Sequence, residues 1–301
     1  MAGLNITEND IPDLHGKKAV ITGGSSGIGF AAATILTARG AEVFILDIEE
    51  PEEHGNTSMH WIKCDISKWS DLVFAFAQVD VVHIAIANAG VSEDGTYLSD
   101  EYDESGNLLE PSYKVIDVNF KGTLNFIKLA CNAMRTHSVE GSVVITSSAT
   151  AYAAEQSLPV YSGTKAALVN FMRAMRSYLR DTGITINVVA PAATITKLLP
   201  ADLAAPILAA NLPVSTAHFV GLAVVYSAVA TESKKAQSYG RDTLEWERAP
   251  GRWNGRTILT HGDVYTELEG PLSDTRHIWF GDENVRQTRL QQSMTDFRAG
   301  N

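Results

Sequence analysis

Short apolar runs alternate along the chain with longer segments in which apolar residues recur every three or four positions. The runs are typical of buried strands and predict strands at residues 18–22, 42–46, 59–63, 81–87, 142–146, 184–190 and 256–260. The periodic segments predict helices at 27–39, 113–136, 160–180 and 216–230. Strands that are apolar on both faces and alternate with helices form parallel sheets covered on both sides. The pattern therefore predicts an α/β fold with a doubly wound parallel sheet.

No repeat or linker divides the chain, so we predict a single domain over residues 1–301 with a C-terminal extension. Several segments fall outside the alternating pattern: an N-terminal extension at 1–16, an acidic loop at 91–111, and the segments 192–214, 231–254 and 263–301. Loops this long in a compact domain are usually lids, interface elements or disordered regions. Their roles stay open at this stage.

The chain is acidic, with 24 Lys and Arg against 35 Asp and Glu and a formal net charge of −11. Nucleic-acid phosphates and anionic lipids repel such a chain, so we expect neither as a partner. The N-terminus shows no secretory pattern, and the apolar stretch at 219–230 is too short to span a membrane. The two cysteines and eight histidines lack metal-ligand spacing. We expect a cytoplasmic protein with reduced cysteines and no metal.

The first predicted strand runs directly into a glycine-rich segment, and a predicted helix follows. Glycines allow a sharp turn and a close approach to a pyrophosphate, and a helix N-terminus offers free N–H groups at the positive end of its dipole. A glycine cluster alone is also compatible with an ordinary turn, but the strand–loop–helix context favours a dinucleotide site. The residues expected to bind the cofactor here are Gly23, Ser25, Ser26, Gly27, Ile28 and Gly29.

Asp47 ends the second predicted strand, about 20 residues past the glycine loop, where an acceptor for the adenosine ribose belongs. A carboxylate at this place accepts hydrogen bonds from the ribose hydroxyls and repels a 2′-phosphate. Ile48 follows it, and the glycine loop contains no basic residue. We therefore predict NAD rather than NADP as the cofactor, although Asp47 alone is equally compatible with a turn at a strand end.

Two further strand ends have a composition that suits the same cofactor. Asp65, in Cys64-Asp65-Ile66 after the third strand, is placed to bond the adenine amino group. Asn88-Ala89-Gly90 follows the fourth strand, where small residues let the backbone lie against the cofactor. Each is a common loop composition by itself, and it is their order along the chain that favours a cofactor site.

The motifs Thr22-Gly-x-x-x-Gly27-x-Gly29, Asn88-Ala-Gly90 and Tyr161-x-x-x-Lys165 occur in this order, with Asn119 and Ser148 between the last two. In these motifs the chain resembles the compact, single-domain short-chain dehydrogenase/reductase family. The resemblance covers residues 17–196 and, more loosely, 256–262. It implies a Rossmann fold, a nicotinamide dinucleotide as cofactor, and a catalytic set of Asn119, Ser148, Tyr161 and Lys165.

Tyr161 and Lys165 are four residues apart in a predicted helix and therefore lie on one helix face. A free tyrosine has a pKa of about 10, and a nearby ammonium together with the positive nicotinamide ring is expected to lower the pKa of this phenol. The resemblance implies that Tyr161 is the general acid/base and that Lys165 also bonds the nicotinamide ribose. It further implies that Ser148 holds the substrate oxygen and that Asn119 holds a water of a proton relay. Taken alone, such a Tyr/Lys pair is usually a surface contact.

The segment after the sixth predicted strand departs from the family pattern. Pro191-Ala192 stands where the family usually has Pro-Gly, and Thr194 replaces a more usual Val or Ile. Thr196 matches the threonine that contacts the nicotinamide carboxamide. We therefore expect Pro191, Thr194 and Thr196 to bind the cofactor through a slightly altered loop.

In the family the region after Thr196 covers the substrate, and here the predicted lid, residues 192–214, is rich in Leu, Ala and Pro. An apolar lid suits a lipophilic substrate such as a polyketide, terpenoid, steroid or hydroxylated fatty acid. The same apolar residues are equally able to pack on the protein itself. The tail containing Trp279-Phe280 is loosely similar to fungal secondary-metabolism members and to the 15-hydroxyprostaglandin dehydrogenase type.

These features predict an NAD-dependent oxidoreductase that interconverts a secondary alcohol and a ketone on a small lipophilic molecule. A non-redox sensor or scaffold that binds the dinucleotide is an alternative, but it has little need for all four catalytic residues. An epimerase or lyase that retains NAD is another, although such relatives usually have a different glycine spacing and a larger C-terminal domain. The resemblance also implies a homodimer or homotetramer formed through the long helices that contain Asn119 and Tyr161.

Overall fold

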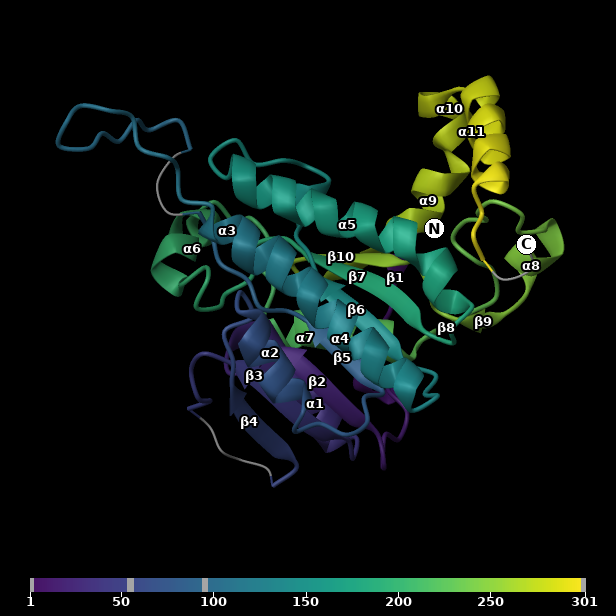
Figure 1. Ribbon diagram of the computed structural model, residues 1–301, viewed down its shortest axis with the longest axis horizontal. Helices are drawn as coiled ribbons and strands as arrows, with labels where there is room; N and C mark the ends of the chain where they lie inside the picture. Colours follow the sequence, from purple (N-terminus) through teal and green to yellow (C-terminus); the bar gives the residue numbers. More distant parts are fainter. Residues whose placement is uncertain (1–2, 53–56, 94–96, 299–301) are drawn as a thin grey trace.

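The computed structural model describes residues 3–52, 57–93 and 97–298, and within them a nine-stranded sheet occupies the centre of the molecule (Figure 1). The strand order is β1-β11-β10-β7-β6-β5-β2-β3-β4, and the neighbours from β10 to β4 are parallel. The order reverses between β2 and β5, which is the switch point where open α/β sheets bind ligands. The parallel strands are β2 (Lys18–Thr22), β3 (Glu42–Asp47), β4 (Met59–Lys63), β5 (Ile84–Ala87), β6 (Ser142–Thr146), β7 (Thr185–Pro191) and β10 (Thr257–His261).

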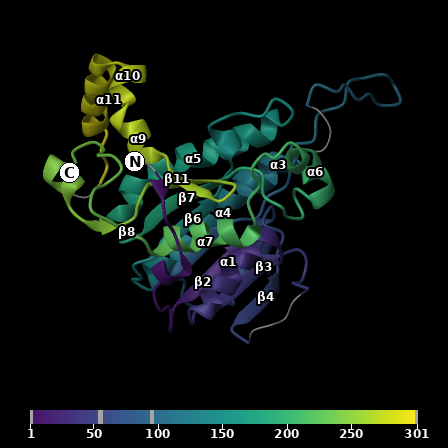
Figure 2. The same cartoon turned by 180° about the vertical axis from the view of Figure 1, so that it is seen from behind.

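Helices cover both faces of the sheet (Figures 1 and 2). On one face α1 (Gly27–Ala38) packs against α7 (Ala217–Val229), and the other face carries α2 (Trp69–Phe76), α4 (Thr123–Thr136) and α5 (Pro159–Arg180). Alternate side chains of each strand divide between two apolar cores, so Val43 faces α1 and α7 whereas Phe44 faces the opposite layer. The predicted doubly wound α/β fold is confirmed.

The parallel strands lie where the apolar runs predict them, except that β5 begins at Ile84 rather than at residue 81. Before this point the backbone N–H of Lys18 donates to Nδ1 of His83 at 3.1 Å. The His83 side chain therefore accepts the hydrogen bond that a backbone carbonyl oxygen would accept in a regular strand. Regular pairing with β2 starts only at Ala19 and Ile84.

Two strands that the pattern did not predict extend the sheet beyond β10. β11 (Val264–Glu267) forms a hairpin with β10, and β1 (Gly3–Leu4) of the N-terminal extension pairs with β11. The prediction of a tail from residue 263 is therefore wrong at its start. β11 is only four residues long, which is too short for its alternation of exposed and buried residues to be recognised. Within the predicted peripheral segments, residues 1–2, 94–96 and 299–301 lie outside the described part of the chain.

The helix predicted at 113–136 is interrupted. α3 (Lys114–Ile116) passes into a π-helical turn, η2 (Asp117–Gly122), before α4 begins. Such turns are rare and frequently mark functional sites, and this one contains the fully buried Asn119. The other predicted helices are confirmed to within one residue as α1, α5 and α7.

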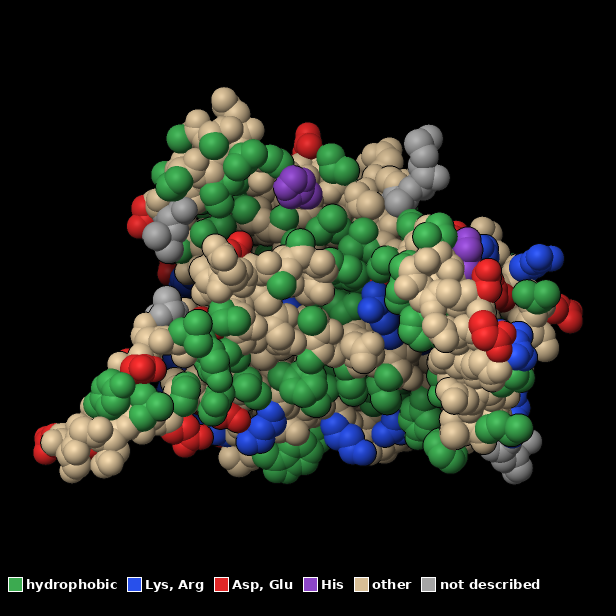
Figure 3. Space-filling model, turned by 90° about the horizontal axis from the view of Figure 1, so that it is seen from above, with side chains coloured by type: hydrophobic (Ala, Val, Ile, Leu, Met, Phe, Trp, Pro, Cys, Tyr) green, Lys and Arg blue, Asp and Glu red, His purple; other side chains and the backbone are tan. Residues whose placement is uncertain are grey.

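The remaining elements lie at the periphery, and two groups project from opposite ends of the face formed by α5: residues 97–111, and the C-terminal helices. Figure 3 looks onto this face and shows hydrophobic side chains gathered between the projections. The peripheral elements are η1 (Glu8–Asp10), η3 (Ala149–Ala151), α6 (Ala201–Ala209), the paired β8 (Thr231–Glu232) and β9 (Gly251–Arg252), α8 (Leu244–Arg248), α9 (Glu269–Asp274), α10 (Arg276–Phe280) and α11 (Asp282–Met294).

Candidate active site

The glycine loop lies at the carboxyl end of β2, where it passes into α1. Gly23 has a φ of +65°, and a Cβ on it would lie 2.7 Å from Cα of Ala89. A Cβ on Gly29 would overlap the carbonyl oxygen of Gly23, so only glycine fits both positions. No side chain caps the first turn of α1, which leaves its N–H groups available to an anion. This cradle of bare backbone fits a dinucleotide pyrophosphate.

Asp47 ends β3 beside the glycine loop, as the sequence predicts. Its Oδ2 accepts a hydrogen bond from the backbone N–H of Ser25 at 3.1 Å, and its Oδ1 accepts one from Glu49 at 3.2 Å. The Ser25 hydroxyl donates to the carbonyl oxygen of Glu49 at 2.6 Å, and the neighbouring Ile48 is 62% exposed. The glycine loop and the turn after β3 thus hold the carboxylate in place between them.

Lys197 is a cation near Asp47 that the sequence interpretation missed. Its Nζ lies 3.1 Å from Oε2 of Glu49 and 3.6 Å from Oε1 of Glu52, so it joins the segment 192–214 to the loop after β3. The two carboxylates offset its charge, and the surroundings of Asp47 stay acidic. Lys197 and Glu49 are 148 residues apart, so no local pattern in the sequence predicts this contact.

The three residues after β4 differ in their surroundings. The side chains of Cys64 and Ile66 lie in the core between the sheet and α2, where burial raises the pKa of the Cys64 thiol to about 12. Only their backbone atoms remain to border a cofactor. Oδ1 of Asp65 accepts hydrogen bonds from the N–H and the hydroxyl of Ser67, at 3.0 and 2.7 Å.

Asn88 joins the carboxyl ends of three strands. Its backbone N–H, like that of Ala89, donates to the Thr22 hydroxyl, at 3.0 and 3.1 Å. Its Nδ2 donates to the Gly23 carbonyl oxygen at 2.9 Å, and its Oδ1 accepts from the Thr146 hydroxyl at 3.1 Å. Thr22 and Thr146 therefore position the site, although in the sequence they look like ordinary strand residues.

Lys165 is buried, with 4% of its surface exposed, and points toward the end of β6. Its Nζ donates to the carbonyl oxygen of Thr146 at 3.0 Å and lies 5.4 Å from the centre of the Tyr161 ring. Burial alone acts on its pKa and lowers it to about 8. Among the described residues no carboxylate opposes this ammonium, and its pKa lies closer to neutral pH than that of an ordinary lysine.

Tyr161 and Ser148 face one another beside this lysine. Burial raises the pKa of Tyr161, and the hydrogen bond with the Ser148 hydroxyl acts in the opposite direction. The expected lowering of this pKa is not met by the protein alone, because burial of the phenol outweighs the Ser148 hydrogen bond. Ser147 points the other way and donates to the Lys165 carbonyl oxygen at 2.8 Å, as strand alternation predicts.

Asn119 lies next to Lys165, on the π-helical turn η2. Its Oδ1 accepts from the N–H of Val91 at 2.8 Å, and its Nδ2 donates to the carbonyl oxygen of Val91 at 2.9 Å. A Cβ on Gly90 would lie 3.2 Å from Oδ1 of Asn119 and 3.5 Å from Nζ of Lys165. The structure therefore brings Asn119, Ser148, Tyr161 and Lys165 together at one edge of the sheet.

The loop after β7 completes this edge. Pro191 ends the strand, and Ala192 has an ordinary negative φ, so this position does not require the usual glycine. The Thr194 hydroxyl donates to the Ala192 carbonyl oxygen at 3.0 Å. The Thr196 methyl group lies against Gly27, where a Cβ would come within 3.1 Å of it, so the segment 192–214 contacts the glycine loop near its start.

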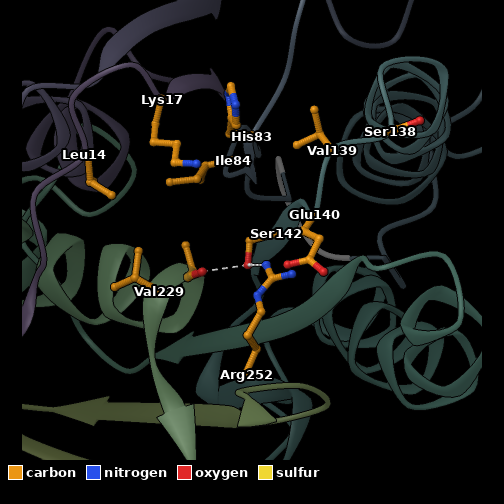
Figure 4. A pocket seen from close by; sticks show the side chains of 11 residues that line it. Leu14, Lys17, His83, Ile84, Ser138, Val139, Glu140, Ser142, Val229 and Arg252 are labelled. Atoms are coloured by element: carbon orange, nitrogen blue, oxygen red, sulfur yellow. Dashed lines mark hydrogen bonds between the residues drawn. The ribbon is translucent and has the colours of Figure 1, made fainter.

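A hollow of about 400 Å³ lies away from these residues, at the amino ends of β2, β5 and β6. Figure 4 shows Lys17, His83 and Arg252 around it. The Arg252 guanidinium donates to the carbonyl oxygens of Gly183 and Gly141, at 3.0 and 2.7 Å, so it holds chain ends together. The carboxyl edge of the sheet, and not this hollow, carries the candidate chemistry.

Within the described residues, no group of three or more His, Cys, Asp or Glu side chains is placed to hold a metal ion. Over the same part of the chain, no helix combines the length and the apolar character that crossing a membrane requires.

The family model of the short chain dehydrogenases matches residues 17–205. Over 300 residues the chain is 54% identical to the short-chain dehydrogenase/reductase prx4 of Penicillium roqueforti, covering 99% of this chain and 90% of the relative. It is 47% identical to the short-chain dehydrogenase/reductase ATR7 of Stachybotrys chlorohalonatus, covering 100% and 96%. The chain belongs to the short-chain dehydrogenase/reductase family, which makes it an oxidoreductase of dehydrogenase/reductase type.

Solved structures show the same fold. A 3-ketoacyl-(acyl-carrier-protein) reductase from Brucella melitensis, complexed with NADH, has a TM-score of 0.63 at 21% identity, covering 83% of this chain and 98% of its own. A short chain dehydrogenase/reductase family protein has the same TM-score at 24% identity, covering 82% and 97%. The family binds nicotinamide dinucleotides, and the glycine cradle fits one.

Proposed function

We propose that the protein is an NAD-dependent oxidoreductase that interconverts a secondary alcohol and a ketone. The observation that carries this proposal is Lys165, a buried lysine beside Tyr161 and Ser148 that forms no ion pair with a carboxylate of the described residues. Burying an unpaired ammonium is unfavourable, so a group of this kind at a cofactor cradle is a strong candidate for chemistry.

In alcohol oxidation Tyr161 takes the proton of the substrate hydroxyl, and the Ser148 hydroxyl donates a hydrogen bond to the substrate oxygen. Lys165 stabilises the phenolate when protonated, and Asn119 borders the route by which the proton leaves. A bound oxidised nicotinamide would supply the hydride acceptor, and its positive ring would favour ionisation of the phenol before the transfer. In ketone reduction Tyr161 donates the proton instead.

The preference for NAD rests on the negative surroundings of the adenosine end. Asp47 is held against the glycine loop by a hydrogen bond, and Glu49 and Glu52 form ion pairs with Lys197. A 2′-phosphate would meet these carboxylates, and the nearby cation, Lys197, is already paired with two of them. The variant Asp47→Ser should lower the kcat/KM ratio of NAD to NADP by about tenfold or more. An unchanged ratio in steady-state kinetics would contradict the preference.

A lipophilic substrate is supported by the lid. Leu198, Leu208 and Leu212 are 47%, 46% and 56% exposed, so about half of each side chain is left uncovered by the protein and is available to a substrate. The fungal relatives match over nearly the whole chain, and a role in secondary metabolism and a cytoplasmic location belong to the same proposal.

We further propose a homodimer or homotetramer formed through α4 and α5, since small residues such as Gly163 and Ala174 line the exposed side of α5.

The decisive experiment compares Tyr161→Phe with Tyr178→Phe, an exposed tyrosine on the same helix. Turnover of a broad panel of lipophilic alcohols and ketones should fall about 10²- to 10⁴-fold in Tyr161→Phe, with NADH binding retained in a fluorescence titration. Tyr178→Phe should behave like the unmodified protein. Hydride transfer to or from no member of the panel would contradict the proposal.

The same preparations separate the two other functions. A sensor or scaffold would bind NADH tightly and turn over nothing. An epimerase or lyase would retain NAD through purification, which absorbance after acid release detects. We expect protein free of bound NAD that turns over with added cofactor.

A further inference from the structure

The helix that carries Tyr161 begins without a cap of its own. Leu158 stands at the N-cap of α5 and offers no side-chain acceptor, and Pro159 follows it as the first helical residue. The first bond within the helix joins the N–H of Ser162 to the Leu158 carbonyl oxygen at 2.9 Å. The N–H of Tyr161 therefore has no partner inside its own helix.

A carboxylate from a distant loop supplies the missing acceptor. Oε2 of Glu93 accepts a hydrogen bond from the backbone N–H of Tyr161 at 2.7 Å, across 68 residues of sequence. The bond is short for an N–H donor, as is usual when the acceptor is charged. A negative charge at this place also lies at the positive end of the α5 dipole.

Asn119 fixes the chain just before Glu93. Both polar groups of the Asn119 side chain bond the backbone of Val91, two residues before Glu93. Asn119 is fully buried on the π-helical turn η2. A continuous path of hydrogen bonds and two residues of chain thus joins the Asn119 amide to the Tyr161 backbone.

We propose that Glu93 is a positioning residue: its carboxylate caps α5 and sets the place of Tyr161 relative to Asn119 and Lys165. The inference rests on the proposed catalytic role of Tyr161. Without this cap the first turn of α5 is free to fray, and the phenol moves with it. A displacement of about 1 Å from a productive geometry lowers turnover by about 10²-fold.

Three variants test the proposal. Glu93→Ala removes the acceptor, Glu93→Gln retains an acceptor oxygen without the charge, and Glu101→Ala removes an exposed carboxylate from the same loop as a control. We expect kcat to fall about 10- to 100-fold in Glu93→Ala, with the Kd for NADH unchanged. Glu93→Gln should return kcat to within about threefold of the original, because charge at a helix end contributes little beyond the bond itself. Glu101→Ala should have no effect.

Equal losses in Glu93→Ala and Glu93→Gln would overturn the proposal, because the charge itself would then act on the substrate. A rise in the Kd for NADH that matches the loss in kcat would also overturn it, since the loop would then serve the cofactor.

A second measurement does not depend on turnover. Hydrogen exchange of peptides covering residues 158–165 should become faster in Glu93→Ala and stay unchanged in Glu101→Ala. Unchanged exchange in Glu93→Ala would overturn the proposed cap even if activity falls. Absence of hydride transfer in the unmodified protein would instead refute the proposed function, while the exchange experiment would still report on the contact.

Discussion

The two halves of α5 both bury cations, but they treat them differently. In the N-terminal half, Lys165 has no carboxylate partner within residues 3–52, 57–93 and 97–298, and burial lowers its pKa to about 8. In the C-terminal half, Arg173 donates two hydrogen bonds of 2.8 Å to Glu269, and Arg180 lies 3.1 Å from Asp242. One half keeps a charge that is free to titrate, and in the other half the ion pairs of Arg173 and Arg180 attach the C-terminal helices and the segment 231–254.

The choice of residue follows the same division. Arg176 is also buried and donates to Oε1 of Gln237 at 2.5 Å, yet burial lowers its pKa only to about 10. A guanidinium therefore stays charged where a lysine would begin to titrate. Arginine suits the structural half of α5, and lysine suits the half that handles protons.

The largest effect is expected from Lys165→Met, which removes the unpaired cation. Turnover should fall about 10²- to 10⁴-fold, because Tyr161 loses the group that stabilises its ionised form. The free energy of unfolding should not fall, since the removed ammonium was buried against the Thr146 carbonyl oxygen rather than against a carboxylate. Steady-state kinetics and urea unfolding test this, with the exposed Lys128→Met as control. A large loss of stability would show that Lys165 is structural.

Glu269→Gln should lower the stability of the protein and leave its turnover unchanged. Glu269 is 5% exposed and accepts hydrogen bonds from Arg173 and from the Tyr152 hydroxyl. Removing its charge leaves the partly exposed Arg173 without its ion pair, which should lower the free energy of unfolding by about 2 kcal/mol. Turnover of the folded protein should be retained. Glu283→Gln, which breaks an exposed pair with Arg286, is the matched control and should leave the urea midpoint unchanged.

The third prediction concerns pH. The unfolded chain binds the Lys165 proton up to a pH near 10.5, whereas the folded chain releases it near pH 8. The unfolded state therefore holds more protons between these values, and the stability contributed by this group rises with pH. From pH 8 to pH 10 the unmodified protein should gain about 2 kcal/mol over Lys165→Met. Because both proteins contain the same tyrosines, the difference between their free energies of unfolding cancels the effect of tyrosine ionisation. A difference that does not change with pH would contradict the lowered pKa of Lys165.

A smaller effect is expected at the far end of α5. The Arg180 guanidinium lies 4.3 Å from the centre of the Trp246 ring, which ties the segment 231–254 to this helix. Trp246→Leu should lower the free energy of unfolding by about 1 kcal/mol. A double-mutant cycle with Arg180→Met isolates the energy of this contact. A coupling energy near zero would show that the contact between Arg180 and Trp246 does not stabilise the protein.

Local patterns of the sequence determined much of this protein. Apolar runs predicted the parallel strands, the 3.6-residue period predicted α1, α5 and α7, and the four-residue spacing placed Tyr161 and Lys165 on one helix face. These are short-range properties, because burial on both faces of a strand and position around a helix depend on neighbouring residues. The glycine loop was equally readable, since its turn is specified by consecutive residues.

Tertiary structure alone decided the rest. The cap that Glu93 provides for α5, the link from Lys197 to Glu49 and the pairing of β1 with β11 join residues that are distant in sequence. Burial of Lys165 and the resulting fall in its pKa also depend on packing from several elements. A contact between distant segments cannot be recognised from the periodicity of either segment. Each side chain of such a contact has a partner that comes near it only in the folded structure.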